Sequence, residues 1–363
     1  MSSLDPGLPR VTASRRLPAE WEPHDATWLA WPPCHAGGTS AWPEVDDVFP
    51  RIVATLLPGE RVEVLCIDAP TEAHARTELA AHHVSPAHWR THLIPSERLW
   101  MRDISGMVVV RDRRALELLH WDRHVWRTSP GYVHTPAVGV AVARAEGLAR
   151  FEPLRSDGHR RMALDGGAID VNGRGLLLAT EQHLLSDARQ HNPGVTRGEY
   201  ERAFEHLLGV SRTIWLGDGC VGDATNGHVD NVARFVAADT VVLAFESDPS
   251  DGNHEPSADN FRRLELASAG PLRVVTLPFP RPLAKDGQRL PASYANFYIA
   301  NEVVLVPTFE DPNDDLALRT LGALFPERRV IGIGALGLLL GLGTLHCLTR
   351  EIPRRPAPAQ ALR

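Results

Sequence analysis

Cysteine is scarce in this chain of 363 residues, and its N-terminus lacks a hydrophobic leader. The first ten residues, MSSLDPGLPR, contain no apolar segment of the kind found in signal peptides. The cysteines lie far apart and form no CxxC pair, which argues against a disulfide-built scaffold. Both absences predict a reducing, cytoplasmic setting. The four cysteines are Cys34, Cys66, Cys220 and Cys347.

Positive charge is also in short supply. The chain has 38 basic and 45 acidic residues, a net charge of -7 and an isoelectric point near 6.2. Nucleic acids and anionic membranes usually require a clustered basic face, so we expect neither as a partner and instead expect a small or cationic one. The length and the 43% hydrophobic content allow a sizeable core, in one large domain or two ordinary ones.

Long hydrophobic runs are nearly absent, and the exception extends from Val330 to Leu348. Its length and the spacing of Gly337 and Gly341 would suit a packed membrane helix. Each glycine, however, destabilises a helix by about 1 kcal/mol, and a His-Cys pair stands at the end of the run. We therefore interpret the run as buried strand and loop beside a functional site.

The rest of the chain alternates between paired strands and single helices. Turn signals between apolar runs predict hairpins with turns near Asn172-Gly173, Ala238-Asp239 and Asn301-Glu302, and a strand within 102–119. Helical patterns are found at 46–59, 197–209 and 314–326. The polar stretch 247–260 is predicted to be a loop near the mouth of the site, and the tail 352–363 to be disordered.

Polar residues near the starts of these strands recur at a rough interval. Asp103, Asp165, His228 and Asn296 follow one another at separations of about 60 to 70 residues. Such spacing is typical of a repeated supersecondary unit that buries its apolar face against its neighbours. A repeat architecture is therefore favoured over two unrelated domains.

Some of the same residues are suited to chemistry. On a strand, His228 and Asp230 would face the same side, as a general acid/base and a cation-binding carboxylate would. A hydrogen-bonded core histidine is the competing interpretation. Asp103 follows Trp100, where it could bind a cation beside the ring or form a surface ion pair with Arg102.

Two further positions have both a chemical and a structural interpretation. Asp165 precedes two glycines, which allow another group to approach the backbone, although a hairpin turn would also explain them. Cys347 is a strong nucleophile once its thiolate is stabilised, although a lone cysteine is more often a small buried hydrophobe. A zinc hydrolase is disfavoured, because no HxxxH, HxH or CxxC pair surrounds these residues.

Six motifs occur in one order along nearly the whole chain. They are LPAEWEPHDATWLAWP, WMRD, LDGGAIDVNGRGLLLATEQHLL, GDATNGHVDNVARF, SYANFYIANEVVLVPTFEDPNDDLAL and GTLHCLT. In this order they resemble the agmatine deiminase and bacterial-type peptidylarginine deiminase family, which modifies guanidino groups. The resemblance implies an α/β pentein fold, a propeller of five pseudosymmetric ββαβ-type repeats, formed as a single domain over residues 1–363.

The resemblance also implies roles in catalysis. Cys347 looks like the nucleophile, His228 like the general acid/base, and Asp165 like the acid that orients His228. His346 is expected to point away from the sulfur, as the strand neighbour of Cys347. Family members usually have glutamate before the double glycine, whereas this chain has the shorter Asp165.

The remaining implied roles concern the substrate. Asp103 and Asp230 look like the carboxylates that grip the guanidinium, and Trp100 and Asp223 are candidates for recognising its far end. The implied reaction converts agmatine to N-carbamoylputrescine and ammonia through a covalent thiouronium on Cys347, with no metal or organic cofactor. Another guanidino substrate, an amidinotransferase and a silent binding protein stay open, and a homo-oligomer is compatible with the sequence.

Overall fold

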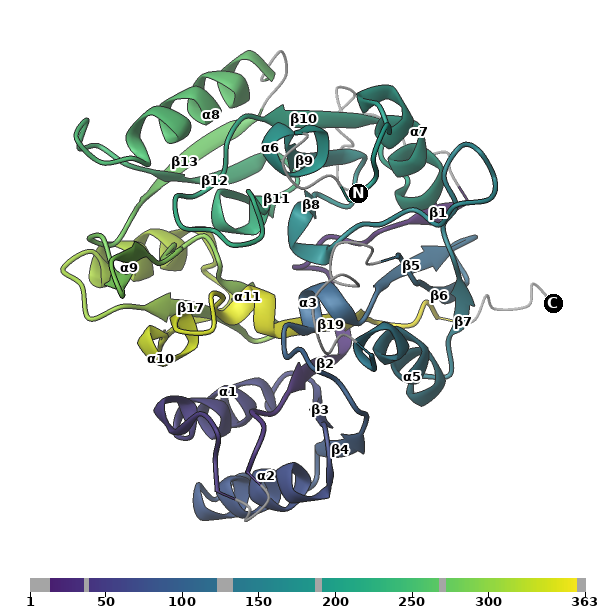
Figure 1. Ribbon diagram of the computed structural model, residues 1–363, viewed down its shortest axis with the longest axis vertical. Coiled ribbons are helices and arrows are strands. Elements are labelled where there is room, and N and C mark those ends of the chain that lie inside the picture. The colour runs from purple at the N-terminus through teal and green to yellow at the C-terminus, as the bar shows by residue number, and fades with distance from the viewer. Residues whose placement is uncertain (1–13, 36–38, 123–132, 187–190, 268–271, 358–363) are drawn as a thin grey trace.

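In the part of the chain that the structure describes, five sheets of three or four strands are arranged about the middle of the molecule, and helices lie along its rim (Figure 1). The computed structural model describes residues 14–35, 39–122, 133–186, 191–267 and 272–357. Each of the five sheets combines at least one antiparallel pair with at least one parallel pair. The chain therefore has the mixed α/β fold expected from its sequence.

Three of the five sheets use strands that follow one another in the chain, one adds residues 15–16 to strands between 107 and 151, and one joins strands from both ends of the described chain. The first sheet contains β1 (Arg15–Arg16), β5 (Met107–Arg111), β6 (Ala115–Leu119) and β7 (Ala149–Phe151). The second contains β8 (Ile169–Val171), β9 (Leu176–Thr180) and β10 (Arg212–Leu216). The third contains β11 (Ala233–Ala237), β12 (Thr240–Phe245) and β13 (Arg273–Pro278).

The other two sheets hold the C-terminal strands, and one of them also holds three strands from the N-terminal part of the chain. The fourth contains β16 (Tyr298–Ile299), β17 (Val303–Thr308) and β18 (Arg329–Gly334). The fifth contains β2 (His24–Ala30), β3 (Arg61–Cys66), β4 (Trp89–Leu93) and β19 (Thr349–Pro353). A separate small hairpin joins β14 (Ala284–Lys285) to β15 (Gln288–Arg289).

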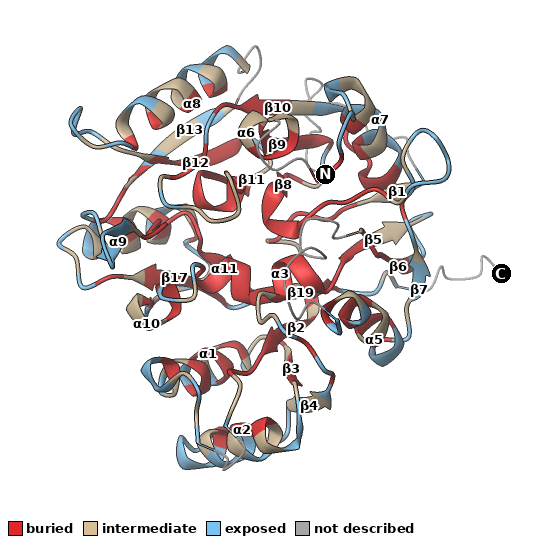
Figure 2. Cartoon of the chain, in the orientation of Figure 1, coloured by how far each residue is buried: buried red, intermediate tan, exposed pale blue. Residues whose placement is uncertain are grey.

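Helices connect the parallel strands, because a parallel pair requires a crossover. Those on the rim are α1 (Val48–Leu56), α2 (Ala69–Ala81), α5 (Val138–Ala145), α7 (Arg197–Leu208), α8 (His254–Ala267) and α9 (Asp314–Leu324). The shorter helices are α3 (Met101–Ile104), α6 (Glu181–Leu185), α10 (Leu336–Leu339) and α11 (Leu345–Leu348). The outer faces of several rim helices are exposed, whereas α3 and α11 are buried (Figure 2).

Local sequence signals explain several of these boundaries. Thr196 and Glu199 form a capping box at the start of α7, and Gly209 ends that helix with a left-handed φ of 71°. At the turn between β8 and β9, the Asn172 side chain accepts the backbone N–H of Leu176 at 2.9 Å, and Gly173 has a φ of 66°. The hairpin and the helix predicted from these residues are confirmed.

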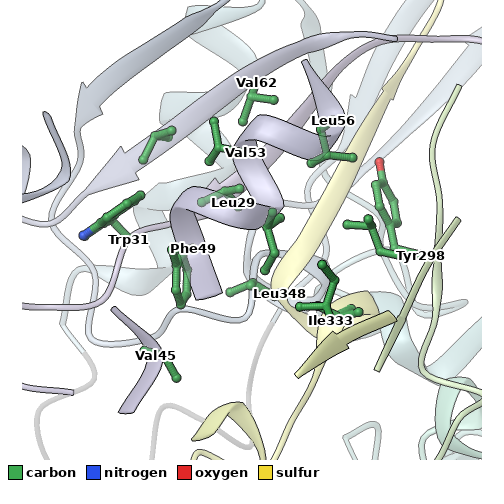
Figure 3. Packing of buried hydrophobic residues seen from close by; sticks show 14 of the residues in the cluster. Leu29, Trp31, Val45, Phe49, Val53, Leu56, Val62, Tyr298, Ile333 and Leu348 are labelled. Atoms are coloured by element: carbon green, nitrogen blue, oxygen red, sulfur yellow. The ribbon is translucent and has the colours of Figure 1, made fainter. Parts of the chain in front are cut away.

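One core cluster packs α1 against the fifth sheet (Figure 3). Phe49, Val53 and Leu56 lie on one face of α1, as their helical spacing predicts, and all are buried. Leu29 of β2 and Leu348 of α11 belong to the same cluster. Each such side chain contributes about 1.5 to 3 kcal/mol on burial, so this core anchors the segment that carries Cys347.

Two predictions about polar segments are wrong. The stretch 247–260 is not a loop throughout, because α8 begins at His254, and the Ser257 and Asn260 side chains of that helix are buried. The tail is not disordered from residue 352, because Ile352 pairs with Ala26 in the fifth sheet and is 1% exposed. Residues 358–363 of the predicted tail lie outside the described residues.

The long hydrophobic run is divided among β18, α10 and α11. Its glycines permit tight contacts: a Cβ on Gly337 would lie 2.5 Å from the carbonyl oxygen of Glu44. Among the described residues, no helix has both the length and the apolar character needed to cross a membrane.

Candidate active site

Buried polar residues from four separate connections meet in the middle of the molecule. Asp103 lies in α3, Asp165 precedes a 3-10 turn at Gly166–Ala168, and His228 precedes another at Val229–Asn231. α3 contacts both α11 and the turn at 166–168, and that turn contacts the one at 229–231. Four residues predicted from distant motifs, including Cys347 in α11, therefore converge on one site.

The backbone at this site departs from the predicted strands. His228 is not on a strand, because Asp223 accepts its backbone N–H at 2.9 Å and holds it at the start of the turn. Cys347 is in the short helix α11, where Asn296 Oδ1 accepts the backbone N–H of His346 at 3.1 Å. Side chains from other segments thus override the local strand pattern, and β19 begins only at Thr349.

Gly167 lies where three of the polar side chains approach the backbone. Its N–H donates to Asp103 Oδ1 at 2.9 Å. A Cβ at this position would lie 2.5 Å from Nδ1 of His228 and 2.8 Å from Oδ2 of Asp230. The double glycine therefore allows an imidazole and two carboxylates to gather around one point, as the sequence predicted for close approach.

The thiol of Cys347 is buried among polar groups. Its Sγ lies 3.5 Å from Oδ2 of Asp230 and accepts a hydrogen bond from Nδ2 of Asn296 at 3.2 Å. Burial, followed by the charges of Asp230 and Asp103, raises the pKa of Cys347 well above its usual value. In the free protein the sulfur therefore carries a proton, and a nearby positive charge would favour its ionisation.

His346 does not point away from this site. Its Nδ1 lies 2.8 Å from the same Oδ2 of Asp230, and its Nε2 lies 2.9 Å from Glu20 Oε2. The prediction was wrong because it assumed a strand, on which neighbouring side chains alternate, whereas α11 is helical. Although burial opposes ionisation, the hydrogen bond and charge of His346 keep the pKa of Asp230 below its usual value.

Glu20 anchors this network to two buried arginines. Its Oε2 accepts from Arg102 at 2.8 Å, and its Oε1 accepts from Arg234 at 2.8 Å. Burial raises the pKa of Glu20, but Arg234, His346 and Arg102 together lower it well below the usual value. Glu20 is therefore ionised and holds His346 in place. Arg102 pairs with Glu20 in the interior, and not with Asp103 at the surface as the alternative interpretation of the sequence had it.

The imidazole of His228 faces carboxylates on two sides. Its Nε2 lies 3.6 Å from Oδ2 of Asp165, and both residues are at most 1% exposed. Burial alone would disfavour the charged ring, but Asp103, Asp165 and Asp230 raise the pKa of His228 to about 10. His228 is thus an imidazolium at neutral pH and can donate a proton.

Asp103 is the carboxylate that ionises least readily here. Burial and the charges of Asp165 and Asp230 outweigh the imidazolium of His228 and raise the pKa of Asp103 to about 6. At Asp165 the balance is reversed: despite burial, His191, His228 and His183 hold its pKa below the usual value. The carboxylates around the thiol make this a site for a cation.

Sequence reasoning missed three residues of the site. His183 stacks edge-on against His228 with ring centroids 4.5 Å apart, and Nε2 of His191 lies 3.7 Å from Oδ2 of Asp165. Asn296 was noted only for its spacing, yet it bonds both the thiol and the backbone of α11. These three residues are far in sequence from the residues that they contact, so no local pattern indicated the contacts. Two of them, His183 and Asn296, nevertheless lie within the six motifs quoted above, whereas His191 does not.

Comparison with known proteins places this chain in a family. The family model of the Porphyromonas-type peptidyl-arginine deiminases matches residues 16–353. The chain belongs to this family. Agmatine deiminases of Pseudomonas aeruginosa and Ectopseudomonas mendocina are 32% and 31% identical to it, each match covering 95% of this chain and 96% of the relative.

A solved structure supports the same assignment. The agmatine deiminase of Enterococcus faecalis superposes on this peptidyl-arginine deiminase family chain with a TM-score of 0.83 and 26% identity, covering 95% of this chain and 99% of that one. The mixed α/β fold is thus that of agmatine deiminase structures.

Trp100 and Asp223 lie in different surroundings in this deiminase-family chain. Trp100 precedes α3 and is half-buried, with its ring against Gly343 and edge-on to Trp42 at 6.4 Å. Asp223 uses its carboxylate on its own loop, accepting backbone N–H groups of Thr225 and His228 at 2.8 and 2.9 Å. Trp100 can therefore contribute an aromatic wall, whereas Asp223 shapes the loop that carries His228.

Proposed function

We propose that the chain hydrolyses agmatine to N-carbamoylputrescine and ammonia, with Cys347 as the nucleophile. The observation that carries the proposal is the position of the thiol, 3.5 Å from Asp230 and bonded to Asn296, within a group of buried carboxylates and the His228 imidazolium. The names of the curated relatives, agmatine deiminases over nearly the whole chain, support agmatine as the substrate.

The two carboxylates beside Gly167 suit a guanidinium. Asp103 accepts the N–H of Gly167, and Asp230 lies against the same residue, so both flank one small space. A planar guanidinium presents parallel N–H donors that carboxylates accept in pairs, and this would hold the central carbon against Sγ. The substrate's charge would also offset Asp103 and Asp230 and lower the raised pKa of Cys347.

The reaction would then proceed in two steps. As the cation binds, the Cys347 proton is released to solvent, and the thiolate forms a bond to the guanidinium carbon. The C–N bond to one terminal nitrogen then breaks as His228 protonates that nitrogen and ammonia leaves. A thiouronium remains on Cys347. His228 next accepts a proton from water, and the resulting hydroxide attacks the same carbon. The C–S bond then breaks, the hydroxyl proton passes to the departing sulfur, and the neutral ureido product is released.

Asp165 and the aromatic Trp100 are assigned supporting roles. Asp165 would orient His228 from behind, across the 3.6 Å between Oδ2 and Nε2. Trp100 would border the aliphatic part of the substrate, and Asp223 would act on recognition only through the His228 loop. We also propose that the five sheets are the blades of a five-fold pseudosymmetric propeller forming one domain. A cytoplasmic location and a homo-oligomeric assembly stay predictions.

A screen of guanidino compounds tests the proposal. Agmatine, arginine and an arginine-containing peptide are supplied singly, and ammonia and ureido products are measured. We expect turnover of agmatine without any added amine, and a loss of at least about 1,000-fold in the Cys347→Ala variant, which should still bind agmatine. Cys34→Ala, a change at a partly exposed cysteine, is the matched control.

The outcomes separate the alternatives. An active Cys347→Ala variant would refute the role of this thiol. Turnover of arginine or of the peptide in place of agmatine would change the substrate, and turnover only with an added amine would make the protein an amidinotransferase. Mass spectrometry of the trapped intermediate should show the adduct on Cys347 and on no other cysteine.

A further inference from the structure

Two buried histidines beside Asp165 have no part in the proposed reaction. His183 and His191 are 1% and 5% exposed, and their ring centroids lie 4.7 Å apart. His183 also contacts the ring of His228, and His191 approaches Asp165. Three imidazoles therefore surround one carboxylate behind His228, on the side away from Gly167.

The hydrogen bond made by one ring nitrogen of His183 leaves a lone pair on the other, which faces Asp165 and the neighbouring histidines. Its Nδ1 lies 2.9 Å from the carbonyl oxygen of Thr225, to which only a protonated nitrogen can donate. Nε2 is then an unprotonated acceptor, and it is buried without a hydrogen-bond partner among the described residues.

The ligand atoms of the cluster are close to the separations found in a metal site. One ligand atom each from Asp165, His183 and His228 lie within 4.8 Å of one another. His191 Nε2 lies 3.7 Å from Oδ2 of Asp165 and could supply a fourth ligand. In tetrahedral zinc sites, bonds of about 2.0 to 2.2 Å place ligand atoms about 3.3 to 3.5 Å apart. The separations of Asp165 Oδ2 from His228 Nε2 and His191 Nε2, 3.6 and 3.7 Å, are near that range.

We propose that Asp165, His183, His191 and His228 bind a divalent transition-metal ion of the Zn²⁺ class. Imidazole nitrogens with one carboxylate suit zinc, whereas calcium and magnesium require shells built mainly from oxygens. Asp165 is fully buried beside the three rings, so its carboxylate is held where a shared ion would lie. The site is therefore a property of this chain's own residues.

Metal binding would suspend the proton transfer assigned to His228. The Nδ1 atom of His228 faces Gly167 and Asp230, and its Nε2 atom faces Asp165. A metal on Nε2 replaces the proton there and fixes the ring, so that His228 can no longer gain and lose a proton during turnover. The cluster would thus act as an inhibitory metal site behind the general acid/base.

Cobalt and zinc titrations of the full chain test the binding itself, independently of any enzyme activity. Co²⁺ should give the visible absorption of a tetrahedral ion at one equivalent, and Zn²⁺ should displace it. Absence of a thiolate charge-transfer band would exclude Cys347 as a ligand. His183→Gln should weaken Zn²⁺ binding by at least about 100-fold, whereas His206→Gln, a change at an exposed helical histidine, should leave it unaltered.

Equal zinc affinity in the wild type and in His183→Gln, or no stoichiometric binding to either, would overturn the proposal. Activity provides the second measurement, with each variant compared with its own metal-free rate. Zn²⁺ should inhibit agmatine hydrolysis by the wild type, and a chelator should restore the activity. The His183→Gln variant should keep its activity at the same Zn²⁺ concentration. Binding to this cluster without inhibition would refute the inhibitory role. Failure of agmatine hydrolysis would leave the binding measurements intact and would count against the proposed function alone.

Discussion

The imidazole of His346 and the thiol of Cys347 contact the same oxygen of Asp230. Nδ1 of the ring lies 2.8 Å from Oδ2, and the sulfur lies 3.5 Å from it. Adjacent residues therefore position one carboxylate, which must also face the substrate in the proposed reaction. The other ring nitrogen of His346 is fixed by Glu20 at 2.9 Å, so the carboxylate is supported from behind.

Replacing His346 should reduce activity more than stability, because His346 holds the carboxylate of Asp230 in place. His346→Phe removes one hydrogen-bond partner from each of two buried acids, Asp230 and Glu20, which we expect to lower the free energy of unfolding by about 1.5 to 3 kcal/mol. kcat/KM should fall at least about 100-fold. Urea denaturation and agmatine kinetics measure the two effects.

His346→Asn is the informative companion variant. Its amide can replace the donor to Asp230, so it should recover part of kcat/KM while the bond to Glu20 is lost. If both variants lose activity equally at equal stability, the ring itself and not its hydrogen bond to Asp230 is what the site requires.

Acid should inhibit the enzyme through Asp103. The pKa of this carboxyl is raised to about 6, and only its ionised form can accept a guanidinium. Protonation of Asp103 alone should therefore lower kcat/KM about tenfold at pH 5, and this effect should be gone above about pH 7. An acid limb centred below pH 5 would show that another group controls binding, and Asp103→Asn should abolish the limb along with most of the activity.

A longer acidic side chain at position 165 should clash sterically with His183. Asp165→Glu adds a methylene in a fully buried position beside three imidazoles, and we expect a cost of about 1 to 3 kcal/mol in stability. His183→Ala makes room, so the double variant should be more stable than the sum of the two changes predicts. Additive losses in a denaturation cycle would indicate that the two side chains do not compete for space.

A methyl group on Gly167 should damage the site selectively. In Gly167→Ala the new Cβ would meet His228 Nδ1 at 2.5 Å and Asp230 Oδ2 at 2.8 Å, so both must shift. We expect a loss of at least about 100-fold in kcat/KM. Gly322→Ala in α9 is the control, since nothing lies within 4 Å of its Cβ and it should stabilise the helix by about 0.5 to 1 kcal/mol. Normal kinetics in Gly167→Ala would contradict the described crowding.

Local chemistry made the strands and helices predictable. The turn at Asn172 and Gly173 and the capped helix α7 depend on neighbours within a few residues. The wrong predictions involve long-range partners: His228 was taken as a strand residue because its pattern alternates, but Asp223 and the packed turns hold it elsewhere. The buried side chains of α8 could likewise not be predicted, because that segment is mostly polar.

The site was predictable only as a set of residues. Motif order located Asp103, Asp165, His228, Asp230 and Cys347, and the structure brings these side chains into one space. The pairing of Glu20 with His346 links residues at opposite ends of the chain, and no spacing rule relates them. The same holds for the contacts of His183 and Asn296.

The pairing of β19 with β2 makes the thiol depend on a contact between distant parts of the chain. Thr349, two residues after Cys347, pairs with Leu29. Contacts between residues far apart in sequence form later than local ones, because closing a long loop costs more chain entropy. We therefore expect the reactive centre to assemble late in folding, after the local helices and hairpins around it.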